Sequence, residues 1–183
     1  MQYNVEDHER RQAKTPHELF MVNLVAFHLL LTPAAIVLGL GAYGLVLLLV
    51  CSGSIIGYIY LRARRLHPDS SWYVTMHWRL AFKRAKPLLL AYAITAGIML
   101  TGLLITTGIE RHTTQEIVFT IFSRIGIMPV FVMVLVTFVL ESGSIYQAGI
   151  GVVPDDLVGR FPPPPELEAV ASAPEPGDGG SAV

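Results

Sequence analysis

Charged residues are scarce in this sequence, and long stretches contain almost none. Of the 183 residues, 52% are hydrophobic and only 15% are charged, whereas soluble domains carry about 25% charged residues. The shortage is not spread evenly, because it falls in four long apolar segments that contain no Asp or Glu. This distribution argues against a soluble globular domain and favours a membrane protein.

Cysteine and recognisable catalytic patterns are equally rare. The single cysteine, Cys51, lies in an apolar segment, so neither an internal disulfide nor a cysteine metal cluster can form. Ser52 and Ser54 have no neighbouring histidine, and no glycine-rich loop leads into Lys-Ser or Lys-Thr. His67 and His77 lack the spacing of a zinc site. These absences predict a protein that is not an enzyme and holds no metal.

The four apolar segments are each long enough to cross a membrane. We place these spans at about residues 19–38, 42–61, 87–108 and 117–140. Twenty helical residues extend about 30 Å, the thickness of the hydrocarbon core. The sequence therefore predicts an all-α polytopic membrane protein. Its transmembrane domain, residues 19–140, should be a four-helix bundle built from two helical hairpins.

Basic residues indicate the orientation of the spans. The loop 62–86 holds seven of the thirteen Lys and Arg residues, the N-terminal tail 1–18 holds three, and the loop 109–116 holds one. Loops rich in Lys and Arg stay in the cytoplasm. We therefore expect an integral protein of the bacterial inner membrane with both termini in the cytoplasm.

The basic loop also has its own helical pattern. From about Ser71 to Lys86, apolar residues including Trp78 fall on one side, and Arg79, Lys83 and Lys86 fall on another. This pattern predicts a short interfacial helix that contacts the headgroups of anionic lipids. The alternative is that these residues simply flank the third span. A position between two spans makes nucleic acid an unsuitable partner for these cations.

The two ends of the chain are polar. Residues 1–18 should form a polar cytoplasmic tail, and residues 141–183 are acidic and rich in Pro and Gly, with Pro162 to Pro165 in a run. Such a composition cannot bury a core, so we expect the C-terminal tail to be largely disordered. Because the tail is acidic and the 62–86 loop is basic, weak contact between them is expected.

Small residues recur at helical spacing in two spans. The second span contains Gly53 and Gly57, and the third contains Ala93, Gly97 and Thr101. Small residues four apart let another helix approach closely. We expect these positions to support helix packing.

Arg124 is the one charged residue well inside a predicted span. It could extend toward lipid phosphate or Glu116, or bond the carbonyl of Ile125, which Pro129 leaves without its helical partner, together with Ser123. Alternatively, it could contact an anion or an acidic residue of another subunit.

His28 is the second polar residue deep in a span, and Pro33 should kink the helix that carries it. A hydrogen bond to a carbonyl or to Thr32 is the simpler interpretation. Ligation of haem b would require a second ligand at the same depth, for which the other histidines are unsuitably placed. Met99, Met128 or a histidine from a partner chain would have to supply it.

Three functions remain compatible with these features. The leading hypothesis is a non-enzymatic accessory, anchoring or scaffolding subunit of a larger inner-membrane complex, because Arg124 has no acidic partner in the spans. The alternative is a small homo-oligomeric transporter or channel in which Arg124 contacts an anion. The third is a haem b electron-transfer anchor that uses His28. The expected partners are the lipid bilayer and either other membrane subunits or further copies of the chain.

Overall fold

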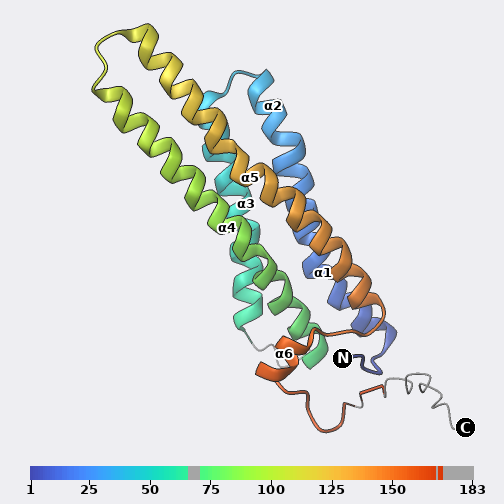
Figure 1. The fold of residues 1–183 in the computed structure, drawn as a ribbon. Helices are drawn as coiled ribbons and strands as arrows, with labels where there is room; N and C mark the ends of the chain where they lie inside the picture. Colours follow the sequence, from blue (N-terminus) through green and yellow to red (C-terminus); the bar gives the residue numbers. More distant parts are fainter. Residues whose placement is uncertain (66–70, 168, 171–183) are drawn as a thin grey trace, which may run out of the picture.

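The computed structural model describes residues 1–65, 71–167 and 169–170. Within them the fold is helical, with no β-strand (Figure 1). The elements are α1 (Asp7–Asn23), the π-helix η1 (Leu24–Leu31), α2 (Thr32–Val37), α3 (Gly41–Arg64), α4 (Trp72–Thr107), α5 (His112–Gly149) and α6 (Asp155–Arg160).

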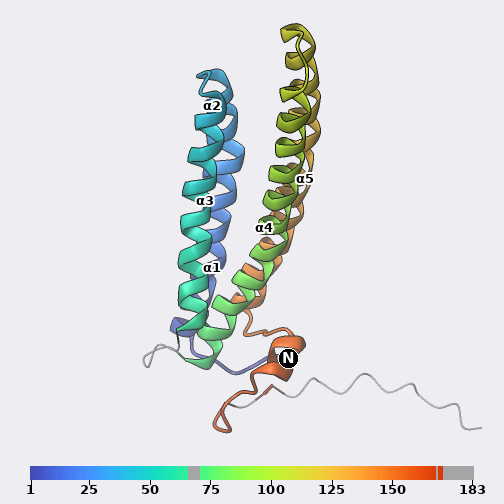
Figure 2. The same cartoon turned by 90° about the vertical axis from the view of Figure 1, so that its left-hand side faces the viewer.

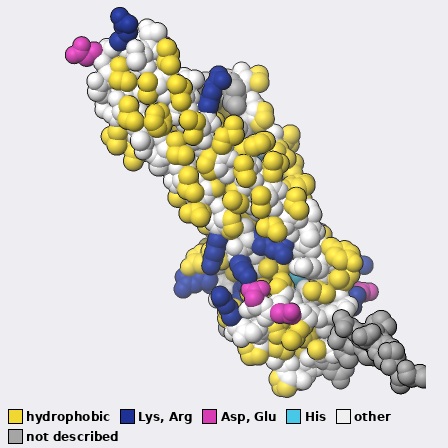
Figure 3. All heavy atoms as spheres, viewed as in Figure 1, with side chains coloured by type: hydrophobic (Ala, Val, Ile, Leu, Met, Phe, Trp, Pro, Cys, Tyr) yellow, Lys and Arg dark blue, Asp and Glu magenta, His cyan; other side chains and the backbone are white. Residues whose placement is uncertain are grey.

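Four helical rods are long and apolar enough to cross a membrane, so the four long apolar helices expected from the sequence are present. The first rod joins α1, η1 and α2, and α3, α4 and α5 form the other three. The first rod and α3 form one hairpin, and α4 and α5 form the other (Figure 2). On the face seen in Figure 3, hydrophobic side chains cover most of the surface, while Lys and Arg gather near α6. We call this the basic end, and the opposite end the far end.

The first hairpin departs from regular α-helix immediately before Pro33. Residues Leu24–Leu31 form a π-helix, whose last turn is closed by a bond from the Thr32 N–H to the carbonyl of Phe27. The Thr32 hydroxyl donates to the same carbonyl at 3.1 Å. Proline has no N–H to donate, so a carbonyl in the preceding turn loses its usual hydrogen-bonding partner. The carbonyls ahead of the proline therefore pair with N–H groups five residues further along the chain, as in a π-helix. Gly39, with φ of 65°, then allows the turn into α3.

The expected short interfacial helix is not a separate element. Instead, α4 runs without a break from Trp72 to Thr107 and includes Pro87. Ser71 caps its first turn by accepting a bond from the Val74 N–H, 3.3 Å away. The first turns of α4 are buried on several sides, and these tertiary contacts hold the segment in line with the span. Trp78, expected at the lipid headgroups, is only 6% exposed and packs against other side chains.

Both polar ends of the chain are more ordered than their composition predicts. The helix α1 already begins at Asp7, so most of the expected N-terminal tail is helical. The helix α5 extends to Gly149 and residues 150–167 then fold across the basic end, so the expected disorder is wrong for this part. The Tyr3 N–H donates to the carbonyl of Gly151 at 2.8 Å, and the Val153 N–H donates to that of Met1 at 2.9 Å. The expected tail at 168 and 171–183, and loop residues 66–70, lie outside the described residues.

Candidate functional sites in the bundle interior

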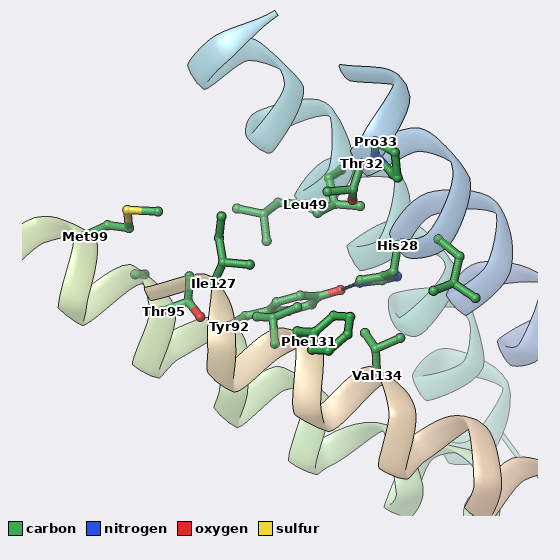
Figure 4. A pocket seen from close by; sticks show the side chains of 14 residues that line it. His28, Thr32, Pro33, Leu49, Tyr92, Thr95, Met99, Ile127, Phe131 and Val134 are labelled. Atoms are coloured by element: carbon green, nitrogen blue, oxygen red, sulfur yellow. Dashed lines mark hydrogen bonds between the residues drawn. The ribbon is translucent and has the colours of Figure 1, made fainter. Parts of the chain in front are cut away.

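A cavity of about 430 Å³ lies between the two hairpins (Figure 4). All four rods contribute to its wall. The lining residues are His28, Leu29, Thr32, Pro33, Leu48, Leu49, Tyr92, Thr95, Ala96, Met99, Ile127, Val130, Phe131 and Val134. None of them is charged, and most are aliphatic or aromatic. We refer to this cavity as the cleft.

Two polar side chains of the cleft wall, His28 and Tyr92, belong to a hydrogen-bonded group that also includes the buried Ser52. The Tyr92 hydroxyl lies within hydrogen-bonding distance of His28 Nε2 and 2.8 Å from Ser52 Oγ. His28 Nδ1 lies 3.4 Å from the carbonyl oxygen of Asn23. A carbonyl can only accept, so Nδ1 carries the ring proton and Nε2 accepts from Tyr92. Ser52 in turn donates to Tyr92, which completes a chain from α3 through α4 to η1.

The π-helix positions His28 for this chain. Its ring lies nearly parallel to that of Tyr92, with 10° between the planes and 5.8 Å between the centroids. Figure 4 shows the two side chains extending toward each other, with Phe131 beside Tyr92. The cleft therefore has a flat aromatic wall with polar atoms along it.

A second polar cluster is buried near the basic end, where α1 packs against α4 and α5. His17 Nδ1 lies 2.6 Å from Glu141 Oε2, and His17 Nε2 lies 3.0 Å from His77 Nδ1. All three side chains are completely buried. His17 therefore links Glu141 to His77 through both of its ring nitrogens.

Two further side chains of α4 lie beside this cluster. Arg84 donates to the carbonyl of Leu140 and to the Ser144 hydroxyl. The ring of Tyr73 meets the edge of His77 at 4.8 Å between centroids, and its hydroxyl donates to the carbonyl of Ala148 at 2.9 Å. These contacts connect the cluster to the end of α5.

Arg124 lies on the exposed surface of α5, away from both polar clusters. It lines a surface hollow with Glu116, Ile117, Thr120 and Ile121. Among the described residues it forms no hydrogen bond or ion pair. Its side chain is therefore available to lipid headgroups or to another chain.

The small residues singled out in the sequence do not pack inside the bundle. A Cβ added at Gly53, Gly57 or Gly97 would meet no atom within 4 Å, and Ala93 and Thr101 are exposed. The close approach of α4 and α5 instead occurs at Gly102, where an added Cβ would lie 2.6 Å from Phe122 Cβ.

Of the three cations expected at lipid headgroups, one is exposed and two contact the C-terminal segment. Lys86 is exposed. Lys83 forms an ion pair with Asp156, and Arg79 stacks on the ring of Phe161 at 3.7 Å from its centroid. Trp72 donates to the carbonyl of Phe161 at 3.1 Å. The C-terminal segment thus contacts the basic region, as expected from their opposite charges, but through specific side chains.

Sequence reasoning identified His28 but missed the groups that surround it. Tyr92 and Ser52 lie in apolar segments where single hydroxyl residues are unremarkable. His17, His77 and Glu141 lie near the ends of the predicted spans and far apart in the chain. Their only shared sequence signal is an ionisable group at the edge of an apolar run. Comparison of this chain with models of protein families, with curated proteins and with solved structures gives no match.

Proposed function

We propose that this protein is a non-enzymatic integral protein of the bacterial inner membrane that binds an uncharged lipid-soluble molecule in the cleft. The observation that carries the proposal is an apolar cavity between membrane-spanning helices with a hydrogen-bonded chain on one wall. Cavities of a few hundred Å³ with few polar groups are typical of small-molecule sites. In this proposal the basic end faces the cytoplasm, because Lys and Arg are concentrated there.

The lining limits the chemistry of the ligand. With no charged side chain in the wall, a charged head group would be buried without a counter-charge, which is costly. Tyr92 and His28 can exchange their mutual hydrogen bond for one to a hydroxyl or carbonyl of the ligand. The flat wall formed with Phe131 suits a ring. A lipid with a flat, uncharged head and an apolar tail satisfies all three conditions.

Thermal unfolding with two probes tests this binding. Decylubiquinone has a flat head with carbonyl groups, whereas decanoate has a similar tail and a charged head. A ligand that binds only the folded state raises the unfolding temperature. We expect decylubiquinone, but not decanoate, to stabilise the purified protein in detergent.

Two substitutions on α4 make the test specific to the cleft. Ala93 and Ala96 are both exposed, but only Ala96 lines the cleft. Ala96→Phe should abolish stabilisation by decylubiquinone because the new ring occupies the cavity, and Ala93→Phe should retain it. Equal stabilisation of both variants, or of neither, would contradict the proposal.

A role as an accessory or anchoring subunit is the second candidate. It is favoured by features that the chain does not use for its own packing, namely the exposed faces at Gly53 and Gly97 and the exposed Arg124. A second chain could pack on these faces and supply an acidic partner for the arginine.

Substitution of Arg124 tests the second candidate. Arg124→Leu should leave the fold intact but reduce recovery of the native complex, because a buried acid without its partner costs about 3–5 kcal/mol. Arg124→Lys should restore recovery only in part, since lysine cannot form a two-pronged contact. The measurement is co-purification from membranes with all forms expressed equally. Equal recovery of the parent and both variants would reject an inter-subunit role for Arg124.

A further inference from the structure

The two threonines of the cleft wall use their hydroxyl hydrogens within the protein. Thr32, which follows the π-helix, donates to the carbonyl of Phe27 at 3.1 Å. Thr95 on α4 donates to the carbonyl of Gly126 on α5 at 2.6 Å. Both threonines line the cleft (Figure 4). A hydroxyl has one hydrogen and two lone pairs, so toward a ligand each of these oxygens can only accept a hydrogen bond.

His28 and Tyr92, the other polar side chains of the wall, use their hydrogens in the same way. His28 Nδ1 donates to the carbonyl of Asn23, and the Tyr92 hydroxyl donates to His28 Nε2. Ser52, which does not line the cleft, donates to the Tyr92 oxygen and leaves it one lone pair. Among the described residues that line the cleft, each side-chain N–H and O–H is therefore already donated to the protein. The wall offers a ligand only acceptors.

A carbonyl and a hydroxyl meet such a wall differently. A carbonyl can only accept, so Tyr92 would have to turn its hydrogen away from His28 to bind it. His28 is only 9% exposed, and its Nε2 would then be buried without a partner, which weakens binding. A hydroxyl can accept the hydrogen of Tyr92 and donate its own to His28, or it can donate to a threonine oxygen. In either arrangement no buried group loses its partner.

We propose that the cleft selects a ligand that donates a hydrogen bond, namely a lipid whose ring carries a hydroxyl, as in a phenol or a quinol. This ligand is the ring-headed lipid of the proposed function, on which the assignment rests. Its ring lies along the aromatic wall of Tyr92 and Phe131, and its hydroxyl donates to the acceptors beside that wall. The corresponding quinone occupies the same cavity but binds more weakly, because both of its oxygens are acceptors.

Decylubiquinol and decylubiquinone test this selectivity, because they share ring substituents and tail and differ in the two oxygens. Each is titrated into the purified full chain in detergent, without oxygen so that the quinol stays reduced. The dependence of the unfolding temperature on ligand concentration gives the Kd. We expect the Kd of the quinol to be about tenfold lower, the effect of one buried acceptor that keeps its partner.

Replacement of His28 tests the origin of the preference. In His28→Leu the Tyr92 hydroxyl has no imidazole to donate to, so its hydrogen is free for a quinone carbonyl. The quinol should then bind no more tightly than the quinone. His112→Leu is the matched control, because His112 is an exposed histidine that does not line the cleft, and it should retain the tenfold preference. Each ligand partitions into detergent equally in all titrations, so a change in the ratio of Kd values reports on the protein.

The outcomes separate the selectivity from the proposed function. If decylubiquinone binds the parent as tightly as decylubiquinol, or more tightly, the selectivity is rejected while binding in the cleft stands. If neither compound stabilises the parent, both are rejected. A preference for the quinol that persists in His28→Leu would also overturn the assignment. The comparison on the parent needs no variant, so the test does not depend on how His28→Leu folds.

Discussion

At the residue scale, two glycines on α4 have opposite roles despite similar sequence surroundings. Gly102 is buried against α5, and an added Cβ would lie 2.6 Å from Phe122 Cβ. Gly97 is exposed, and an added Cβ would meet nothing within 4 Å. The sequence pattern highlighted Gly97, whereas the packing depends on Gly102. Spacing alone cannot distinguish a glycine that faces a neighbour from one that faces lipid.

These glycines provide the first prediction. Gly102→Ala should lower the stability of the folded protein by about 1–3 kcal/mol, because the methyl group forces the two helices apart. Gly97→Ala should be neutral or stabilise by up to about 1 kcal/mol, because alanine is the better helix former. Thermal unfolding in the same detergent compares the two variants. Equal destabilisation by both would show that the close contact of α4 with α5 is not at Gly102.

At the element scale, α4 is the helix whose course differs most from the sequence-based expectation. Pro87 removes one N–H donor from the helix, and the basic residues before it suggested a separate interfacial segment. In the structure the same helix continues through Pro87, and Tyr73, His77 and Trp78 are buried in the bundle. Burial against other helices outweighs the loss of one hydrogen bond.

The length of α4 provides the second prediction. Spin labels at Arg79→Cys and Leu104→Cys, in a Cys51→Ser background, are separated by 25 residues. A continuous helix places them about 38 Å apart, from the rise of about 1.5 Å per residue. A right-angled bend at Pro87 would shorten this to about 28 Å. Pulsed electron paramagnetic resonance should give the longer distance. The shorter distance would show that residues before Pro87 form a separate interfacial helix.

At the scale of the whole molecule, the C-terminal segment closes the basic end of the bundle. The ion pair between Lys83 and Asp156 attaches α6 to α4. The bond from the Lys83 ammonium lowers the pKa of the Asp156 carboxyl below its ordinary value. Because the pKa of Asp156 is lower in the folded protein, the ion pair stabilises the fold at pH values above the pKa that this carboxyl has in the unfolded chain. The stabilisation is lost as the pH falls through the pKa of the carboxyl in the folded protein.

The third prediction follows from the direction of this pKa shift. Asp156→Asn should destabilise the protein at neutral pH, by no more than about 1 kcal/mol because both side chains are exposed. The difference from the parent should disappear below the pKa of the folded carboxyl. Thermal unfolding of parent, Asp156→Asn and Lys83→Gln at several pH values measures this. The two variants should have the same effect, and their combination should add nothing. A difference that persists at the lowest pH would exclude the ion pair as its source.

The fourth prediction concerns orientation in the membrane. Thr113 lies at the far end and Glu166 in the segment that closes the basic end, and both are exposed. In a Cys51→Ser background, Thr113→Cys should react with an impermeant thiol reagent added outside intact cells. Glu166→Cys should react only after the cells are opened, if the basic end faces the cytoplasm as proposed. Labelling of Glu166→Cys in intact cells would show that the basic end faces the outside and would contradict the proposed topology.

The sequence by itself determined the features that depend on local composition. In lipid, the backbone N–H and C=O groups of a long uncharged segment find hydrogen-bonding partners within that segment only if it is helical. The number of apolar helices and the all-helical class therefore follow from residues near one another in the chain. The departure from regular α-helix before Pro33 follows in the same way, because it depends on a single residue and its own backbone.

Only the tertiary structure decided which residues meet. Glu141, His17 and His77 come from three helices, and no spacing in the chain connects them. His28 stood out in the sequence, but its partner Tyr92 did not, because a tyrosine in an apolar run is equally compatible with the lipid surface and the interior. The C-terminal segment illustrates the same limit, because its composition indicated disorder. It is ordered where it packs on the basic end, and contacts with distant parts of the chain provide the free energy that local composition lacks.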